Sequence, residues 1–209
     1  QLIVSFLQWE TTRRQADQAF EKVMATMVDI NELRVSFEPE VVNIIGSDYP
    51  LAVPRVMRMR EALNEIYLRE HDVIMRSLVG KAKKEQRAYV ESLPGVMPYV
   101  ASQVILLSFG GHAMPTDNKL VALLAQEKVV GPTMAPAEVE PFLLRHVKAD
   151  DALSVHLRLQ AWSDSSRRPA VAAITAPVAV GTVKTTAKPT RAKTTKKTQK
   201  RAPKKKPAR

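Results

Sequence analysis

The sequence predicts an all-α domain followed by a disordered basic tail. Apolar residues recur at helical spacing through residues 1–164, and no segment shows sustained apolar–polar alternation with hairpin turns. Several medium-length helices joined by short connections are typical of a compact α-domain. After Ser163 the composition becomes rich in Ser, Ala, Pro and Val, and then in Lys and Thr. We therefore expect a helical domain at 1–163, a linker at 164–183 and a disordered tail at 184–209.

The first helices are expected where apolar residues return every three or four positions. Two early segments show this spacing, at Leu2, Ile3, Phe6 and Leu7 and at Phe20, Val23, Met24 and Met27. Pro50 and Pro54 interrupt the chain before a longer helix near 56–69. The inner side of this longer helix is expected to carry Met57, Leu63 and Tyr67.

The second half of the domain carries clearer start and stop signals. A charged helix near 83–92 is expected to lead into the turn Leu93-Pro94-Gly95. The apolar helix that follows is expected near 98–109, and Gly110-Gly111 is a strong signal for its end. Three further helices are expected near 116–127, 136–147 and 150–162.

The composition excludes several classes of site. Cysteine is absent, which excludes disulfides, Cys-ligated zinc and iron–sulfur clusters in this chain. His71, His146 and His156 lack metal-ligand spacing, so we expect no metal ion and no cofactor. No apolar run approaches the roughly 20 residues of a membrane span, and we expect no membrane partner. The chain begins at Gln1 inside an apolar pattern, so we expect that further residues precede it.

The formal net charge of +11 is located in the tail. Twelve of the 32 Lys and Arg residues fall in 184–209, which has no acid, and the other 20 are set against all 21 acids. A Lys/Ala/Pro/Thr segment of this kind is similar to the tails of linker histones. It is expected to bind DNA phosphates with little sequence preference and a steep salt dependence. The residues expected to contact phosphates are Lys184, Lys188, Arg191, Lys196, Lys197, Lys200, Arg201, Lys204, Lys205 and Lys206.

One segment of the domain carries the strongest functional signal. Leu93-Pro94-Gly95-Val96 precedes a buried helix, and Asp117 follows that helix so that Leu93 to Asp117 spans 25 residues. The segment resembles the active-site half of helix-hairpin-helix DNA glycosylases of the endonuclease III type, which carry a Leu-Pro-Gly-Val-Gly turn and an Asp at this spacing. The stretch Gln8-Trp9-Glu10-Thr11-Thr12 is similar to the family segment that lies beside the extruded base.

The resemblance implies roles for individual residues. Asp117 would stabilise the charged transition state and activate the attacking water. Gln8, Glu10 and Tyr99 would line the base pocket, and the backbone of Gly95, Val96 and Met97 would approach a DNA phosphate. By its residue type alone, Asp117 could equally serve as a helix N-cap.

This sequence departs from the family at several points. Tyr99 stands where the family's catalytic Lys is found, which removes Schiff-base chemistry through that residue. Met97 replaces the second Gly of the turn, Pro98 removes a backbone N–H, and the four-Cys cluster loop is absent.

Two functions are compatible with these observations. The first is a monofunctional DNA N-glycosylase for base excision repair, which uses a water activated by Asp117. The second is a non-catalytic DNA-binding or nucleoid-associated protein on a degenerate glycosylase fold. In both cases we expect a monomer on double-stranded DNA, in the cytoplasm at the nucleoid, or in the nucleus if the source is eukaryotic.

Overall fold

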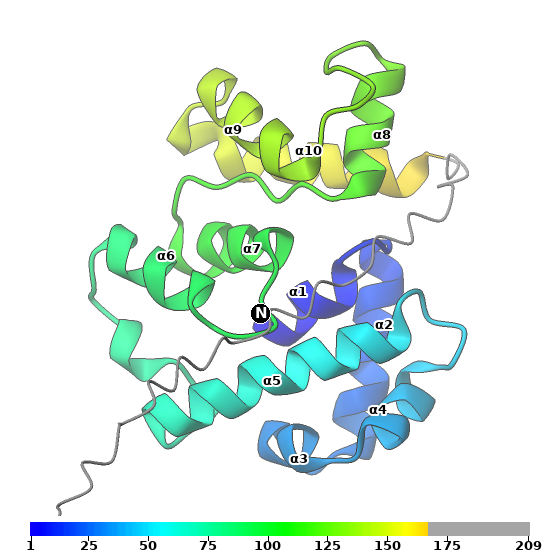
Figure 1. Ribbon diagram of the computed structural model, residues 1–209, viewed down its shortest axis with the longest axis vertical. Coiled ribbons are helices and arrows are strands. Elements are labelled where there is room, and N and C mark those ends of the chain that lie inside the picture. The colour runs from blue at the N-terminus through cyan, green and yellow to red at the C-terminus, as the bar shows by residue number, and fades with distance from the viewer. Residues whose placement is uncertain (167–209) are drawn as a thin grey trace, which may run out of the picture. The chain divides into compact units, whose positions relative to one another are not determined.

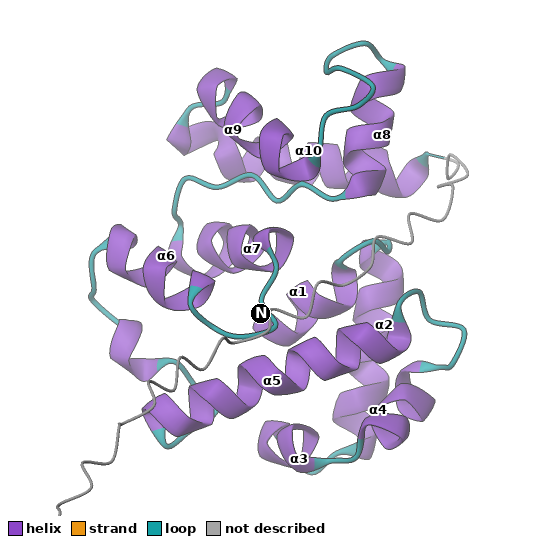
Figure 2. Ribbon diagram, in the orientation of Figure 1, coloured by secondary structure: helices purple, strands orange, loops and turns teal. Residues whose placement is uncertain are grey.

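The computed structural model describes residues 1–166, so most of the expected linker and all of the expected tail lie outside the described residues. The described part of the chain is helical and contains no strand, which confirms the predicted all-α class (Figures 1 and 2). Within it, no helix is both long enough and apolar enough to cross a membrane. The helices are α1 (Leu2–Gln8), α2 (Arg13–Thr26), α3 (Ile30–Val35), α4 (Glu38–Ile45), α5 (Ala52–Glu70), α6 (Lys83–Glu91), α7 (Pro98–Phe109), α8 (Asn118–Gln126), α9 (Pro136–His146) and α10 (Ala152–Ser165), with short 3-10 turns η1 (Arg76–Leu78) and η2 (Ala149–Asp151).

The larger hydrophobic core is built from α1 to α7. The long helix α5 contacts α1, α3 and α4, and α1 in turn contacts α2 and α7 (Figure 1). Every residue from Tyr99 to Leu106 on α7 is buried, so this helix is enclosed on all sides. Pro98 occupies the first turn of α7, and Gly110 ends the helix in a left-handed conformation with φ of 59°. The predicted stop at Gly110-Gly111 is thus confirmed.

A second, smaller core joins α8, α9 and α10. Leu120, Leu124, Val139 and Leu143 are buried in it, together with Met114 from the connection that leads to α8. The sequence placed these three helices correctly, although α10 continues to Ser165 rather than ending near Trp162.

The inner face of α5 differs from the predicted one. Met57 is 46% exposed and Tyr67 is 38% exposed, so neither lies in the core. The buried positions are Val56, Met59, Leu63 and Ile66, which follow one another at the spacing of a helix face. Tyr67 instead lies under the guanidinium of Arg34, 4.0 Å from its ring centre, at the edge of that face.

Candidate active site

Asp117 is the N-cap of α8 and is almost completely buried. Its Oδ1 accepts a hydrogen bond of 2.8 Å from the amide of Leu120, and the residue is 8% exposed. Burial, followed by repulsion from the Glu10 carboxylate, raises the pKa of Asp117 to about 6. The Leu120 amide and the positive charge of Lys119, itself buried, act in the opposite direction. The structure thus confirms Asp117 as a helix N-cap, and its raised pKa makes this carboxylate more basic than an ordinary Asp.

Glu10 reaches the same helix end from the connection between α1 and α2. Its Oε1 accepts hydrogen bonds from the backbone amide and the side-chain amide of Asn118, at 3.0 and 2.7 Å. Glu10 has φ of 59°, a left-handed conformation that costs a non-glycine residue free energy. The N-terminus of α8 thus holds two carboxylates, which the helix dipole favours but which repel each other.

Tyr99 lies in the first turn of α7 with its side chain in the interior. The hydroxyl has no hydrogen-bond partner within residues 1–166. Burial raises the pKa of Tyr99 well above 10, and the carboxylates of Asp117, Asp164 and Glu10 raise it further. At neutral pH the phenol therefore keeps its proton, and it can only donate or accept a hydrogen bond next to the carboxylates.

Gln8 is buried at the end of α1 and is held by α7. Its Oε1 accepts a hydrogen bond of 3.0 Å from Nε2 of Gln103, while Oε1 of Gln103 has no partner within the described part of the chain. Gln103 lies one helical turn after Tyr99, so both side chains are on the same face of α7. The sequence did not single out Gln103, because a buried amide in an apolar helix carries no motif of its own.

Asp164 is a second residue that sequence reasoning missed. One carboxylate oxygen accepts the backbone amide of Arg13 at 3.0 Å, and the other accepts Nε2 of Gln160 at 2.8 Å. Asp164 thereby fastens α10 to the first turn of α2, beside the connection that carries Glu10. His156 is buried on the same helix, and burial followed by the charge of Arg13 lowers its pKa to about 4, so its ring is neutral.

Arg55 holds the α1–α2 connection in place from α5. It is fully buried, and its guanidinium donates hydrogen bonds to the carbonyls of Phe6, Leu7, Trp9 and Pro50. The rings of Tyr49 and Trp9 lie 5.0 and 5.7 Å from it. Because Trp9 directly precedes Glu10, Arg55 fixes the backbone from which the Glu10 carboxylate reaches α8.

The turn between α6 and α7 packs closely on α5. Leu93 is buried, and Val96 and Met97 pack partly against the larger core, so the Met97 side chain is turned inward. Gly95 has φ of 76°, and a Cβ atom there would lie 2.4 Å from the carbonyl oxygen of Arg58. The amides of Gly95 and Met97 make no hydrogen bond to any residue from 1 to 166, which leaves them available to an anion.

Replacing Gly95 with Ala is expected to destabilise the domain by about 2–3 kcal/mol, because the left-handed backbone and the contact with α5 both oppose a side chain. The matched control is Gly80→Ala, since Gly80 has φ of 77° but a methyl group there would meet nothing within 4 Å. Urea unfolding of both variants measures the difference. If Gly95→Ala lowers the free energy of unfolding no more than Gly80→Ala does, the close packing of Gly95 against Arg58 is not present.

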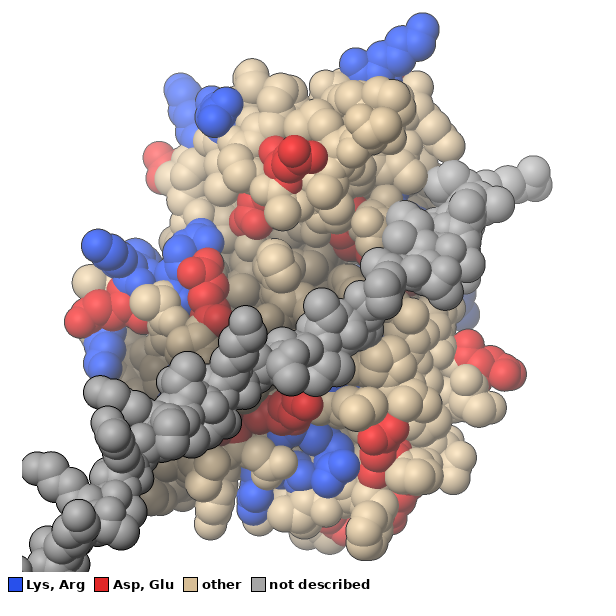
Figure 3. All heavy atoms as spheres, in the orientation of Figure 1, with Lys and Arg blue, Asp and Glu red and all other residues tan. Residues whose placement is uncertain are grey.

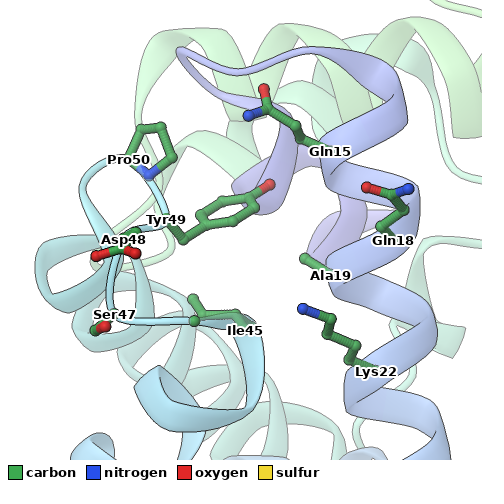
Figure 4. Close-up of a pocket in the computed structure, with 10 residues that line it drawn as sticks. Gln15, Gln18, Ala19, Lys22, Ile45, Ser47, Asp48, Tyr49 and Pro50 are labelled. Atoms are coloured by element: carbon green, nitrogen blue, oxygen red, sulfur yellow. The ribbon is translucent and has the colours of Figure 1, made fainter.

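A separate pocket of about 380 Å³ lies between α2 and the connection from α4 to α5 (Figure 4). Gln15, Gln18 and Lys22 line one side, while Asp48 and Tyr49 line the other (Figure 4). None of the residues at the N-terminus of α8 contributes to it. Within residues 1–166 no group of three or more His, Asp or Glu side chains is arranged to hold a metal ion.

The fold of the described residues resembles that of endonuclease III and of a thymine-DNA glycosylase. Two structures of endonuclease III with DNA, a trapped covalent intermediate with an estranged adenine and a non-covalent complex, give TM-scores of 0.61 and 0.60. Both are 16% identical in sequence to this chain, over 77% of this chain and 71% of theirs. A thermostable thymine-DNA glycosylase gives a TM-score of 0.56 at 18% identity, over 81% of this chain and 75% of its own. No protein-family profile and no curated protein sequence matches the chain.

At these identities the likeness establishes the fold, and it confirms the predicted endonuclease III-like architecture. The structure brings together Asp117, Glu10 and Tyr99, and it joins Gln8 to the same face of α7 through Gln103. Gly95, Val96 and Met97 form the predicted turn between two helices. The tail residues predicted to bind DNA lie outside the described residues.

Proposed function

We propose that this chain is a DNA-binding protein of the base-excision-repair type and acts as a monofunctional DNA N-glycosylase. The observation that carries the proposal is the buried Asp117 carboxylate, which has a pKa of about 6 and lies at the N-terminus of α8 in a fold like that of endonuclease III. At neutral pH this carboxylate is mostly ionised, and it is more basic than an exposed Asp. It is therefore suited to accept a proton from water.

The reaction breaks the bond between C1′ of the sugar and the nitrogen of an extruded base. As that bond lengthens, the base takes the electron pair and the sugar gains positive charge, which Asp117 and Glu10 would stabilise from one side. A water oxygen then bonds to C1′ while its proton passes to Asp117. The base leaves with a proton from solvent, and an abasic sugar remains.

Tyr99 supports the absence of a lyase step. A phenol has no amine and therefore cannot form a Schiff base. Because its pKa is raised well above 10, Tyr99 also stays neutral beside the carboxylates. Its hydroxyl is free of other partners within the described residues and could donate a hydrogen bond to the base or to the water. The product is expected to be an intact strand that breaks only after treatment with alkali.

DNA binding is proposed to involve two regions, the turn between α6 and α7 and the tail at 184–209. The amides of Gly95 and Met97 offer two donors to a phosphate, fewer than a turn without Pro98 would. The residues before the tail have 20 basic and 21 acidic side chains, and Figure 3 shows basic and acidic atoms side by side on the face in view. The tail at 184–209 would therefore provide most of the electrostatic attraction.

The test uses duplexes that each carry one damaged or mismatched base. The protein is incubated with every duplex, half of each sample is treated with alkali, and the strands are separated by length. We expect breaks at one class of base only in the treated half. Binding without breaks on any duplex would favour the alternative function, a non-catalytic DNA-binding protein in which Asp117 is only a helix cap.

Deleting residues 184–209 is expected to flatten the salt dependence of DNA binding, since each phosphate that the tail neutralises contributes about 0.9 to the slope of log affinity against log salt. The slope is measured by fluorescence anisotropy between low and physiological salt. The control keeps the tail's length but replaces its twelve Lys and Arg residues with Gln. An unchanged slope in both variants would refute the proposed role of the tail.

A further inference from the structure

A pocket of about 320 Å³ at the junction of α9, η2 and α10 has the composition of an anion site. Three of its residues are basic and come from three different segments: the last residue of α9, the connection to η2, and the second turn of α10. The lining residues are His146, Val147, Lys148, Asp151, Ser154, Val155 and Arg158.

The two strongly basic side chains of this pocket have no ion-pair partner within residues 1–166. Lys148 and Arg158 form no ion pair and no side-chain hydrogen bond with any residue from 1 to 166, whereas Arg13, Arg69 and Arg87 are each paired with a carboxylate. Asp151 is the one acid that lines the pocket and it reduces, but does not cancel, the positive charge. Two exposed cations that line one pocket without ion-pair partners favour an anion in that pocket.

His146 is fixed with one ring nitrogen free. Its Nδ1 lies 2.8 Å from the carbonyl oxygen of Phe142, and its ring packs against that of Phe142 with centres 4.6 Å apart. Because a carbonyl can only accept, Nδ1 carries the proton and Nε2 has no partner within the described part of the chain. His112 reaches the same region, where its Nε2 lies 2.9 Å from the carbonyl oxygen of Val147.

The apolar part of the lining points to a sugar-phosphate rather than a bare ion. Val147 and Val155 are both partly buried and pack against the smaller core, so they present a firm apolar surface beside the cations. A deoxyribose ring has an apolar face and carries its phosphates at its edge. The combination of Lys148, Arg158 and two Val side chains therefore suits a DNA backbone.

The pocket and the candidate active site are well separated along α10. Ser154 in the pocket and Asp164 beside Tyr99 are ten residues apart on this helix, which corresponds to about 15 Å along a helix axis. One strand of a duplex advances about 3.4 Å per nucleotide along its axis, so the two places are too far apart to contact the same phosphate.

We propose that this pocket binds a backbone phosphodiester of the duplex on which Asp117 acts, at a phosphate other than that of the extruded nucleotide. The proposal rests on the proposed function, because the duplex that carries this phosphate is the substrate of that reaction. Together with the α6–α7 turn, such a contact would fix the direction in which the duplex crosses α10.

The experiment replaces one phosphate at a time with an uncharged methylphosphonate, in a duplex that carries the base the full-length protein releases. Affinity should fall about tenfold when the substitution is at one or two neighbouring phosphates in one flank of that base. In the double variant Lys148→Gln/Arg158→Gln the unmodified duplex should bind about tenfold more weakly, and the same substitution should cause no further loss. Arg145→Gln is the control, since Arg145 is exposed on α9 but does not line the pocket.

A loss at these phosphates that persists in the double variant would overturn the proposal. If the protein releases no base and shows no dependence on phosphate position, the proposed function fails instead. The pocket is then judged by nuclear magnetic resonance titration of the full chain with a dithymidine phosphodiester and with inorganic phosphate. Shifts at Lys148 and Arg158 with the phosphodiester support a backbone site, whereas shifts with neither probe, or with inorganic phosphate alone, overturn it.

Discussion

Replacing Asp117 with Asn is expected to abolish base release while making the folded protein more stable. Asn is as good an N-cap as Asp, so the hydrogen bond from the Leu120 amide should persist. The amide cannot take a proton from water, and the loss of a general base and of a charge beside the sugar should slow base release by about 10³-fold or more. Single-turnover release of the base measures this rate.

The expected gain in stability follows from the pKa of Asp117. The pKa is raised to about 6 in the folded state from an ordinary value of 3.8, so the folded state binds a proton more tightly than the unfolded chain. The stability of the wild-type protein therefore falls as the pH rises through this window, and the full cost, about 2–3 kcal/mol, is present above pH 6. Asn carries no such cost. The variant should melt at a higher temperature than the wild type at pH 7.5 and at a similar temperature near pH 4.

The control for this pair of effects is Asp29→Asn. Asp29 is also an N-cap, and its side chain accepts the amide of Glu32 at 2.7 Å, but the residue is exposed. Its replacement should change neither base release nor the melting temperature by much. If Asp117→Asn releases the base at the wild-type rate, Asp117 is a structural cap and the proposed mechanism is wrong.

The helices that the sequence predicted well are those with local start and stop signals. Pro98 and Pro136 stand at the first turns of α7 and α9, and Gly110 ends α7, so these bounds follow from a few neighbouring residues. The helices α3 and α4 went unpredicted. They have six and eight residues and bury one and two apolar side chains, which is too few to produce a recognisable period.

The residues of the candidate site also fall into those that the sequence could predict and those that it could not. Asp117, Glu10 and Tyr99 could be proposed from the sequence, because the spacing of the Leu93–Asp117 segment resembles that of a known family. Their neighbours Asp164 and Gln103 could not, since each acts through a partner far away in the chain: Asp164 is 151 residues from Arg13, and Gln103 is 95 residues from Gln8. Only the fold brings such pairs together.

Arg55 also acts through partners that are far away in the chain, and the sequence did not single it out. Its replacement with Met is expected to be the most destabilising single change. Burial lowers the pKa of Arg55 to about 10, so it remains charged at neutral pH and depends on its hydrogen bonds. Leu7 would keep its other donors, Thr11 and Tyr49, but within residues 1–166 no other side chain donates to the carbonyls of Phe6, Trp9 and Pro50. Unpaired buried acceptors cost roughly 1–3 kcal/mol each.

The expected loss in the free energy of unfolding is about 3 kcal/mol or more, out of the roughly 5–15 kcal/mol typical of a domain. Urea unfolding measures it, with the exposed Arg14→Met as the control, which should cost little. Arg55→Lys should restore only part of the stability, because one ammonium group cannot reach carbonyls on both sides of the α1–α2 connection as a planar guanidinium does. Since Arg55 fixes the backbone before Glu10, the Lys variant should also release the base more slowly under conditions where it is fully folded. A Met variant as stable as the wild type would show that the connection carrying Glu10 is held by other contacts.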